Sequence, residues 1–195
     1  MSQHEPALVL LGLRMPGLDG FGVLEHMLGD PRLARVPVMV LTAQSLDEKD
    51  MARLTQSVVA VLAKGTFTAG ETLQRIKAVL SGQPRLGTET HRAVRRAMAF
   101  VHEHYAEPVT RDELASAAAI SPRHLARCFA DVLGISPMTY LYRHRIAVAR
   151  QLLDEGNLTV TGVALAAGFS SSSYFAEVFR REVGCSPSAY RNRPR

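Results

Sequence analysis

The strongest constraint on the fold is a motif that occurs twice, fifty positions apart, in the second half of this 195-residue chain. The motif has the form Gly-x-Ser-Pro-x-x-Tyr and covers residues 134–140 and 184–190. Two pairs of apolar residues upstream keep the same offset: Leu125 with Phe175, and Phe129 with Phe179. Self-similarity at a fixed period indicates that a structural unit is repeated. The second half is therefore predicted to contain two copies of one unit.

Capping signals predict that each copy consists of a helix, a tight turn and a second helix. Thr110 and Glu113 form a capping box that starts the first helix. The Ser-Pro pair at 121–122 starts the helix after the turn, because serine accepts from free amides and proline fits the first helical position. In the second copy the serines at 171–173 offer this cap, and Gly184 follows the last turn. This arrangement is typical of helix-turn-helix units.

A helix over residues 138–153 is predicted to join the two units. Its apolar residues recur at helical spacing, and its length is about 24 Å at the usual rise. That length suits a rigid spacer that holds two recognition helices about one DNA turn, roughly 34 Å, apart. At the turn within each unit, Ala118 is matched with Gly168. The fold class predicted for this half is an all-α double helix-turn-helix domain.

The net positive charge lies in the same half. Residues 1–80 hold 8 basic and 8 acidic side chains, whereas residues 81–195 hold 15 arginines, no lysine and 10 acidic side chains, which accounts for the net charge of +5. Arginine makes bidentate contacts to phosphate and guanine, so this composition suits a polyanionic partner. A coding bias toward arginine explains the missing lysine equally well, and the sequence leaves that choice open.

The first 80 residues alternate between strand and helix patterns. Apolar runs that suit buried strands cover 7–11, 36–41 and 58–62, and segments with a helical period cover 21–28, 46–54 and 69–80. Such alternation predicts a partial α/β domain with a parallel sheet of the doubly wound, flavodoxin-like type. Residues 81–92 begin with glycine, proline and polar residues and are predicted to be a linker to a second domain over 93–195.

The expected strand ends carry a characteristic set of residues. Met15-Pro16-x-x-Asp19-Gly20 follows the first strand, Thr42 the second and Lys64 the third. The set resembles the second half of a response-regulator receiver domain. That resemblance implies an Asp at the end of the first strand that accepts a phosphoryl group, which the Thr and the Lys contact. Here the acceptor position is Gly12, and no stretch for two earlier strands and a Mg²⁺-binding acidic pair precedes it. Residues 1–80 are therefore expected to be a truncated receiver remnant that cannot be phosphorylated, with Asp19 as a helix cap.

The second half resembles the DNA-binding domain of AraC-type transcriptional regulators, with units over 110–130 and 160–183. The residues that carry the resemblance are Gly168-Phe169, Ser173-Tyr174-Phe175, Phe179-Arg180 and the closing Gly184-x-Ser186-Pro187-x-x-Tyr190-Arg191. The resemblance implies sequence-specific binding to double-stranded promoter DNA and control of transcription, with RNA polymerase as a further partner. Five aromatic residues are expected in the core: Phe129, Phe169, Phe175, Phe179 and Tyr190.

The resemblance also assigns roles to residues in and around the two recognition helices. The base-facing positions are Arg123, Ala126, Arg127, Ser172, Ser173, Ala176 and Glu177. Phosphate contacts are expected from Ser171, Arg143, Arg145, Arg180, Arg181 and Arg191, although a solvated basic face explains the five arginines equally well. Arginine pairs with guanine edges, whereas Glu is repelled by the DNA backbone. Base discrimination is therefore expected mainly from Arg123 and Arg127.

Together these features predict a two-domain, cytoplasmic, DNA-binding transcriptional regulator that forms the C-terminal part of a two-component or hybrid sensor protein. The alternative is an interaction protein that does not bind DNA and acts through the receiver remnant, as a homodimer or with a partner protein. A gene fragment, a start codon assigned too late and a degenerate module are three explanations of the short N-terminal part. The sequence offers no nucleophile–base pair, no spaced metal ligands and no apolar run of membrane-spanning length, so enzymatic activity, a metal, a cofactor and a membrane are not expected.

Overall fold

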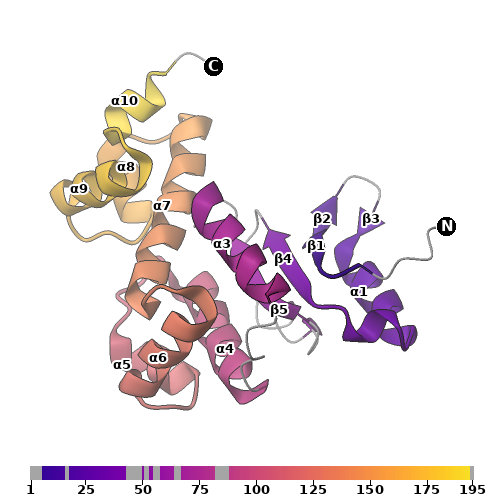
Figure 1. The fold of residues 1–195 in the computed structure, drawn as a ribbon. Coiled ribbons are helices and arrows are strands. Elements are labelled where there is room, and N and C mark those ends of the chain that lie inside the picture. Colours follow the sequence, from indigo (N-terminus) through magenta and orange to yellow (C-terminus); the bar gives the residue numbers. More distant parts are fainter. Residues whose placement is uncertain are drawn as a thin grey trace.

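The structure is a computed structural model that describes residues 6–15, 18–42, 50, 53–54, 58–63, 67–81 and 88–193. A small α/β part at the N-terminus lies beside a larger helical part (Figure 1). The last helix of the α/β part, α3 (Ala69–Leu80), runs along the side of the helical part.

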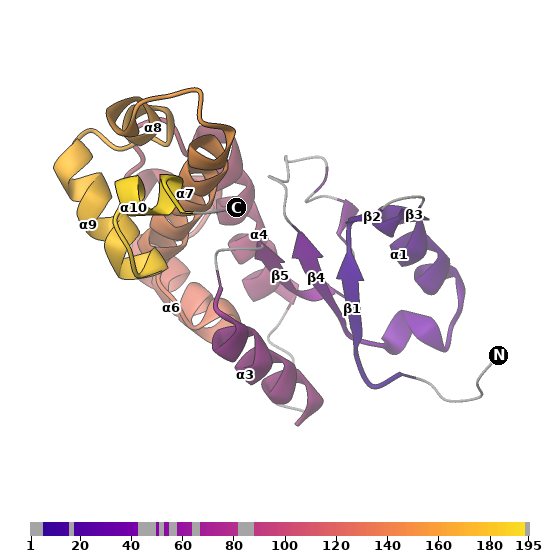
Figure 2. The same cartoon turned by 90° about the horizontal axis from the view of Figure 1, so that it is seen from above.

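A parallel sheet of three strands forms the centre of the α/β part. β1 (Val9–Gly12), β4 (Val38–Thr42) and β5 (Val58–Ala63) lie in the order β1-β4-β5, with Leu11 of β1 opposite Val40 of β4. The central strand β4 is fully buried over Val38–Val40, as a continuous apolar run requires. In both views β5 lies toward the helical part and β1 away from it (Figure 1 and Figure 2). The parallel strands predicted from the apolar runs are therefore present.

The turn after β1 leads into the first helix. Strands β2 (Arg14–Met15) and β3 (Leu18–Asp19) form a short antiparallel pair, and α1 (Gly20–Gly29) follows directly. The carboxylate of Asp19 accepts a 3.1 Å hydrogen bond from the amide of Phe21, which confirms its predicted capping role. Glycine is needed at position 20 because a Cβ there would collide with the carbonyl oxygen of Gly12. A 3-10 turn, η1 (Leu33–Arg35), precedes β4. Most of the helix predicted over 46–54 lies outside the described residues.

The helical part consists of two helix-turn-helix units on either side of a long helix (Figure 1). In chain order its helices are α4 (Thr88–His104), α5 (Arg111–Ala117), α6 (Pro122–Leu133), α7 (Pro137–Glu155), α8 (Val160–Ala166), α9 (Ser172–Val183) and α10 (Pro187–Arg191). α5 and α6 form the first unit, α8 and α9 form the second, and α7 is the predicted joining helix. α4 begins at Thr88, so the helical part starts inside the range that was expected to be linker.

The capping signals form as the sequence indicates. The amide of Glu113 donates to Oγ1 of Thr110 at 3.2 Å, and the amide of Thr110 donates to Oε2 of Glu113 at 2.7 Å, which completes the capping box. The hydroxyl of Ser121 accepts from the His124 amide at the start of α6. Gly184 ends α9 in the left-handed conformation, at a φ of 87°, as its position predicts.

The turns of the two units align differently from the sequence match. The residues with positive φ are Ala119, at 58°, and Gly168, at 84°. Ala118, which the sequence pattern matched with Gly168, instead ends α5 with a φ of −80°. The predicted match was therefore wrong by one residue, because the second turn carries one extra residue, Ser170, before its helix cap. The sequence match did not reveal this extra residue, because it was anchored on α6 and α9, which follow the turns and keep a constant offset of fifty.

The two units have separate hydrophobic cores. One buried cluster extends from the sheet through the first unit and includes Phe129 and Tyr140, whereas the other lies within the second unit and includes Phe175 and Phe179. The five aromatic residues predicted to be core are confirmed, with at most 4% of each exposed: Phe129, Phe169, Phe175, Phe179 and Tyr190. α7 supplies residues to both clusters and is the element that they share.

Candidate nucleic-acid interface

α6 buries one face and exposes the other. The buried face is formed by Leu125, Cys128, Phe129 and Leu133. The predicted base-facing residues Arg123, Ala126 and Arg127 are all exposed. Residues three and four positions apart share a helix face, so these three side chains form one continuous patch. The patch presents two guanidinium groups, which can donate to guanine edges or to phosphate oxygens.

α9 repeats this division with a different exposed face. Phe175, Val178 and Phe179 are buried. The predicted base-facing positions of this helix include three exposed residues, Ser172, Ser173 and Glu177, and one partly buried residue, Ala176. The exposed residues among these four positions therefore offer two small hydroxyl groups and one carboxylate, whereas the predicted positions of α6 offer two guanidinium groups.

The residues predicted to contact phosphate fall into two groups. Ser171, Arg180, Arg181 and Arg191 are exposed. Oγ of Ser171 accepts a 3.2 Å hydrogen bond from the Tyr174 amide as the cap of α9, and its hydroxyl proton remains able to donate. Nε of Arg181 donates to Glu182 at 3.2 Å on the surface. These four side chains lie in or next to α9 and α10.

The other two arginines, Arg143 and Arg145, have partners inside the protein. Arg143 is 16% exposed and forms ion pairs with Glu71 at 3.0 Å and Glu182 at 3.1 Å. Arg145 is 6% exposed, and its Nε and Nη2 each donate at 2.7 Å, to the carbonyl oxygens of Tyr105 and Glu107. These contacts do not fit the phosphate role expected for the two residues. The expectation took α7 as a rigid spacer and did not include the packing of both units against it.

A buried polar cluster that the sequence did not indicate lies between α4 and α7. Nε2 of His102 and the hydroxyl of Tyr140 are 2.8 Å apart, and the ring of His144 stacks on His102 with centroids 4.4 Å apart. Within the described residues, Nε2 of His144 is buried without a hydrogen-bond partner. Burial lowers the pKa of His144 to about 3, and the neighbouring His102 and Arg145 add to this effect. The cluster is part of the core. Its only signal in the sequence is the helical spacing of its residues on a buried face.

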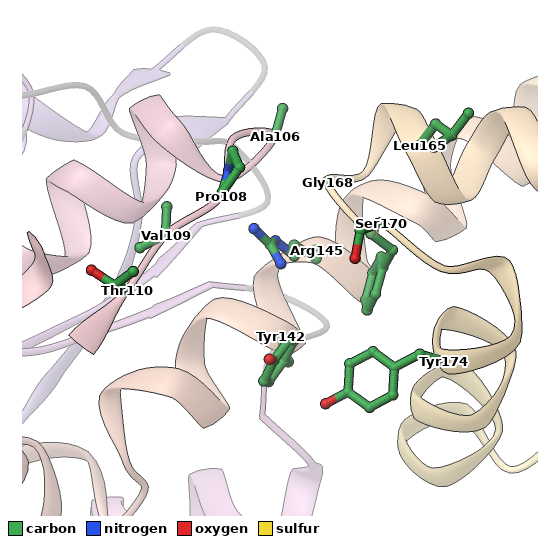
Figure 3. A pocket seen from close by; sticks show the side chains of 11 residues that line it. Ala106, Pro108, Val109, Thr110, Tyr142, Arg145, Leu165, Gly168, Ser170 and Tyr174 are labelled. Carbon is green, nitrogen blue, oxygen red and sulfur yellow. The ribbon is translucent and has the colours of Figure 1, made fainter.

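A cavity of about 380 Å³ lies between the two units, beside Arg145 (Figure 3). One wall comes from the loop of the first unit, with Pro108 and Thr110, and another from the turn of the second unit, with Phe169. Tyr142 of α7 and Tyr174 of α9 line the remaining side, and their rings meet edge to face at 5.8 Å. The cavity shows that the side chains of the two units do not pack continuously against each other.

Two of the three receiver-like positions meet at one end of the sheet. Gly12 and Thr42 end the neighbouring strands β1 and β4, and Thr42 is buried. Lys64 lies outside the described residues. Within the part of the chain that the structure describes, no three His, Cys, Asp or Glu side chains gather in a way that could hold a metal ion. Among the described helices, none is long and apolar enough to cross a membrane.

Comparison with known proteins gives matches to the helical part and to nearly the whole chain. Residues 114–193 match the helix-turn-helix domain family. The thermoregulatory protein LcrF of Yersinia pestis is 28% identical over 198 residues, which cover 93% of this chain and 72% of LcrF. The transcriptional activator RhaS of Escherichia fergusonii is 38% identical over 94 residues, which cover 48% of this chain and 34% of RhaS.

One solved structure matches the helical part along its whole length. It is a transcriptional regulator with an AraC-type DNA-binding domain from Chromobacterium violaceum, with 28% sequence identity and a TM-score of 0.50. The match covers 56% of this chain and 100% of that one. The doubled helix-turn-helix, the family match and these relatives all indicate the same kind of domain. The helical half of this chain therefore has the fold of a doubled helix-turn-helix domain and is similar to the DNA-binding domains of AraC-type transcriptional regulators.

Proposed function

We propose that this protein binds double-stranded promoter DNA in a sequence-specific manner through α6 and α9 and thereby regulates transcription in the cytoplasm. The observation that carries the proposal is the pair of capped helices, each with one face buried and one exposed, that a single helix joins. Because RhaS is a transcriptional activator, activation through contact with RNA polymerase is the mode of regulation that we propose.

The two recognition helices have unequal roles in this proposal. Arg123 and Arg127 discriminate bases, because each can donate two hydrogen bonds to a guanine edge. The remaining positions of the base-facing set are Ala126, Ser172, Ser173, Ala176 and Glu177. The serine-rich face of α9 discriminates bases less strongly than α6 does. This helix mainly fixes the register of the protein on the DNA backbone. The phosphate contacts that fit the structure are Ser171, Arg180, Arg181 and Arg191, which are exposed.

The test is binding to a DNA fragment selected from a random pool, measured at several salt concentrations. Arg123→Ala and Arg127→Ala should each cost about 1–3 kcal/mol on the selected site and relax its sequence preference at one position. Arg32→Ala, in the α/β part, removes an arginine with a 77% exposed side chain and serves as the control. Unchanged affinity in both α6 variants would show that the first unit does not read bases.

For the N-terminal part, we propose a receiver-like module that has lost phosphoryl transfer, which places the chain in a two-component or hybrid sensor context. The parallel sheet supports this, as does the position of Gly12 and Thr42 at one end of it. The glycine at the acceptor position has no side chain to attack phosphorus, so Thr42 and Lys64 have no phosphoryl group to stabilise. The chain is to be incubated with a small phosphodonor and its intact mass measured; a stable added phosphate would refute this part of the proposal.

A second candidate function is that of an interaction protein that acts through the N-terminal part. One observation favours it: α3 exposes Leu73 and Leu80 by 50% and 52%. The two residues are seven positions apart and so lie on one face of α3, and a contiguous apolar face marks a surface that contacts other proteins, here a second copy or a partner protein. The absence of salt-dependent DNA binding by the unmodified chain, together with a concentration-dependent mass in solution, would favour this candidate over the first.

A further inference from the structure

The two helix-turn-helix units contact each other over a narrow boundary beside α7, between the loop before α5 and the turn before α9. We call this boundary the seam. Tyr140 and Leu141 of α7 belong to the buried cluster of the first unit, whereas Ile146 and Ala149 belong to that of the second. The change from one cluster to the other therefore falls between Leu141 and Ile146 of α7, and Arg145 lies in this short stretch. Because a cavity occupies part of the seam, side-chain packing alone gives little resistance to movement of one unit against the other.

Arg145 spans this seam with contacts to both sides. Its guanidinium donates to the carbonyl oxygens of Tyr105 and Glu107, in the loop between α4 and α5 of the first unit. The same guanidinium carbon lies 5.7 Å from the ring centroid of Phe169, in the turn of the second unit. A planar guanidinium can donate from two nitrogen atoms and lie flat against a ring at the same time, whereas a lysine ammonium offers all its donors from a single nitrogen. Figure 3 shows Arg145 between the loop and the turn.

Gly168 makes the second contact across the seam. A Cβ at this position would collide with the carbonyl oxygen of Tyr105 and would lie 2.9 Å from Cα of Ala106 and 3.0 Å from Nε of Arg145. The first two of these atoms are backbone atoms of the other unit, and the third belongs to the residue that spans the seam. The turn of the second unit thus rests directly on the loop of the first, and only glycine allows this approach at a φ of 84°.

We propose that Arg145 and Gly168 are positioning residues that fix the separation and angle between α6 and α9, and so determine which spacing between two DNA half-sites the protein accepts. The inference rests on the proposed function and adds to it a reason for spacing specificity. Each inserted base pair moves one half-site by about 3.4 Å and rotates it by about 34°. Two units held rigidly cannot follow that change, whereas two units joined only by α7 can adjust.

The test uses the full chain and a series of DNA sites. The site selected by the unmodified chain is rebuilt with one or two base pairs inserted or removed between its half-sites, and dissociation constants are measured at one fixed salt concentration. The unmodified chain should lose about tenfold or more in affinity on insertion of one base pair. Arg145→Met and Gly168→Ala should bind the original site more weakly but lose less than about threefold on the same insertion.

Matched variants separate positioning from general damage. Gly156→Ala imposes left-handed strain at a φ of 74° without any atom within 4 Å, so it should keep the full spacing penalty. Arg150→Met removes another arginine of α7, whose Nε donates to Tyr190 within the second unit, and it should also keep the penalty. Arg145→Lys keeps the charge but not the fork of donors, so its spacing penalty should fall between those of the unmodified chain and Arg145→Met.

The outcomes are distinguishable. If the unmodified chain selects no site and shows no salt-dependent binding, the proposed function fails and the inference fails with it. If the unmodified chain binds and both seam variants keep its spacing penalty while folded by circular dichroism, only the inference is overturned. If Arg145→Met does not fold, Gly168→Ala alone decides, because it acts on the same contact through a different group.

Discussion

Nη1 of Arg75 donates a 2.6 Å hydrogen bond to the carbonyl oxygen of Val132, which joins α3 of the N-terminal part to the last turn of α6. A cation suits this place, because the C-terminal end of a helix carries partial negative charge and unpaired carbonyl groups. The ring of Phe67 lies 5.1 Å below the same guanidinium. The N-terminal part is thus in direct contact with α6, the second helix of the first helix-turn-helix unit, at the end opposite its N-terminal cap.

The first prediction concerns this contact. Arg75→Ala should lower the free energy of unfolding by about 1.5–3 kcal/mol, because the bond joins a charged donor to a partly buried carbonyl group. The measurement is urea unfolding followed by circular dichroism. Lys77→Ala removes an exposed cation from the same helix and should change stability by less than about 0.5 kcal/mol. Equal effects of the two variants would show that the Val132 contact contributes nothing.

A second prediction separates the two roles of Glu71. Its carboxylate completes a capping box with Thr68 at the start of α3 and also pairs with Arg143 of α7 at 3.0 Å. Glu71→Gln keeps the cap, since glutamine serves at this position, and should cost up to about 1 kcal/mol through the lost ion pair. Glu71→Ala should cost about 1 kcal/mol more, because it removes the cap as well.

The control for Glu71 is an ion pair that is more exposed. Glu25 and Arg53 lie 3.0 Å apart with side chains 67% and 47% exposed, so Glu25→Gln should be close to neutral. High salt should reduce the cost of Glu71→Gln and leave the extra cost of Glu71→Ala unchanged. If high salt reduced the cost of Glu71→Gln and the extra cost of Glu71→Ala by the same amount, the capping role of Glu71 would be excluded.

The third prediction is a loss of stability in mild acid that comes from His144. Burial lowers its pKa from 6.5 to about 3. Between these two values the unfolded chain binds a proton at this residue and the folded chain does not. Stability therefore falls as the pH falls through this window, with a slope of up to about 1.4 kcal/mol per pH unit from this residue. Unfolding free energies at pH 7.0, 6.0 and 5.0 measure the slope.

Carboxylates contribute to the same slope below about pH 5, so the comparison is made between variants. His144→Leu should flatten the pH dependence of the unfolding free energy between pH 6.5 and 5. A chain with His144→Leu that retained the full slope would show that His144 is protonated in the folded state.

The fourth prediction uses the difference between the two turns. Ala119 has a φ of 58°, a conformation that costs residues with a Cβ roughly 1–2 kcal/mol, and the second unit has glycine at the equivalent place. Ala119→Gly should therefore raise the melting temperature, with a gain of up to about 1 kcal/mol after the entropy cost of glycine. Ala117→Gly, at the last residue of α5, should lower stability by up to about 1 kcal/mol. A loss of stability in both variants would contradict this account of the turn.

Local signals in the sequence predicted the elements that depend on neighbouring residues. Thr110 with Glu113, and Gly184 after α9, act within a single turn of chain, so their roles did not depend on the rest of the fold. The alternation of strands and helices before residue 80 is similarly short-range. The residues predicted to face bases are exposed, apart from the partly buried Ala176, because the buried phenylalanines of α6 and α9 fix which side of each helix faces the core.

Roles that depend on the packing between elements could not be predicted in this way. Arg143 and Arg145 lie two positions apart in α7, and no neighbouring residue in the sequence distinguishes them from surface arginines. Arg145 contacts Tyr105 and Glu107, which are 38 or more residues away in sequence. The partners of Arg143 also lie in other elements. The one-residue difference between the two turns was missed for a related reason, since only the backbone conformation shows which residue has a positive φ.

The sharing of α7 between two cores restricts where the length of the chain can change. One residue inserted near Arg145 would rotate everything that follows by about 100° around the helix axis. Ile146 and Ala149 would turn together with the rest of the second core, and the close approach of Gly168 to Tyr105 and Ala106 would be lost. The loop at 156–159, between α7 and α8, has no such constraint and should accept insertions. Insertions and deletions in natural or engineered variants should therefore fall in the loops and spare the nineteen residues of α7.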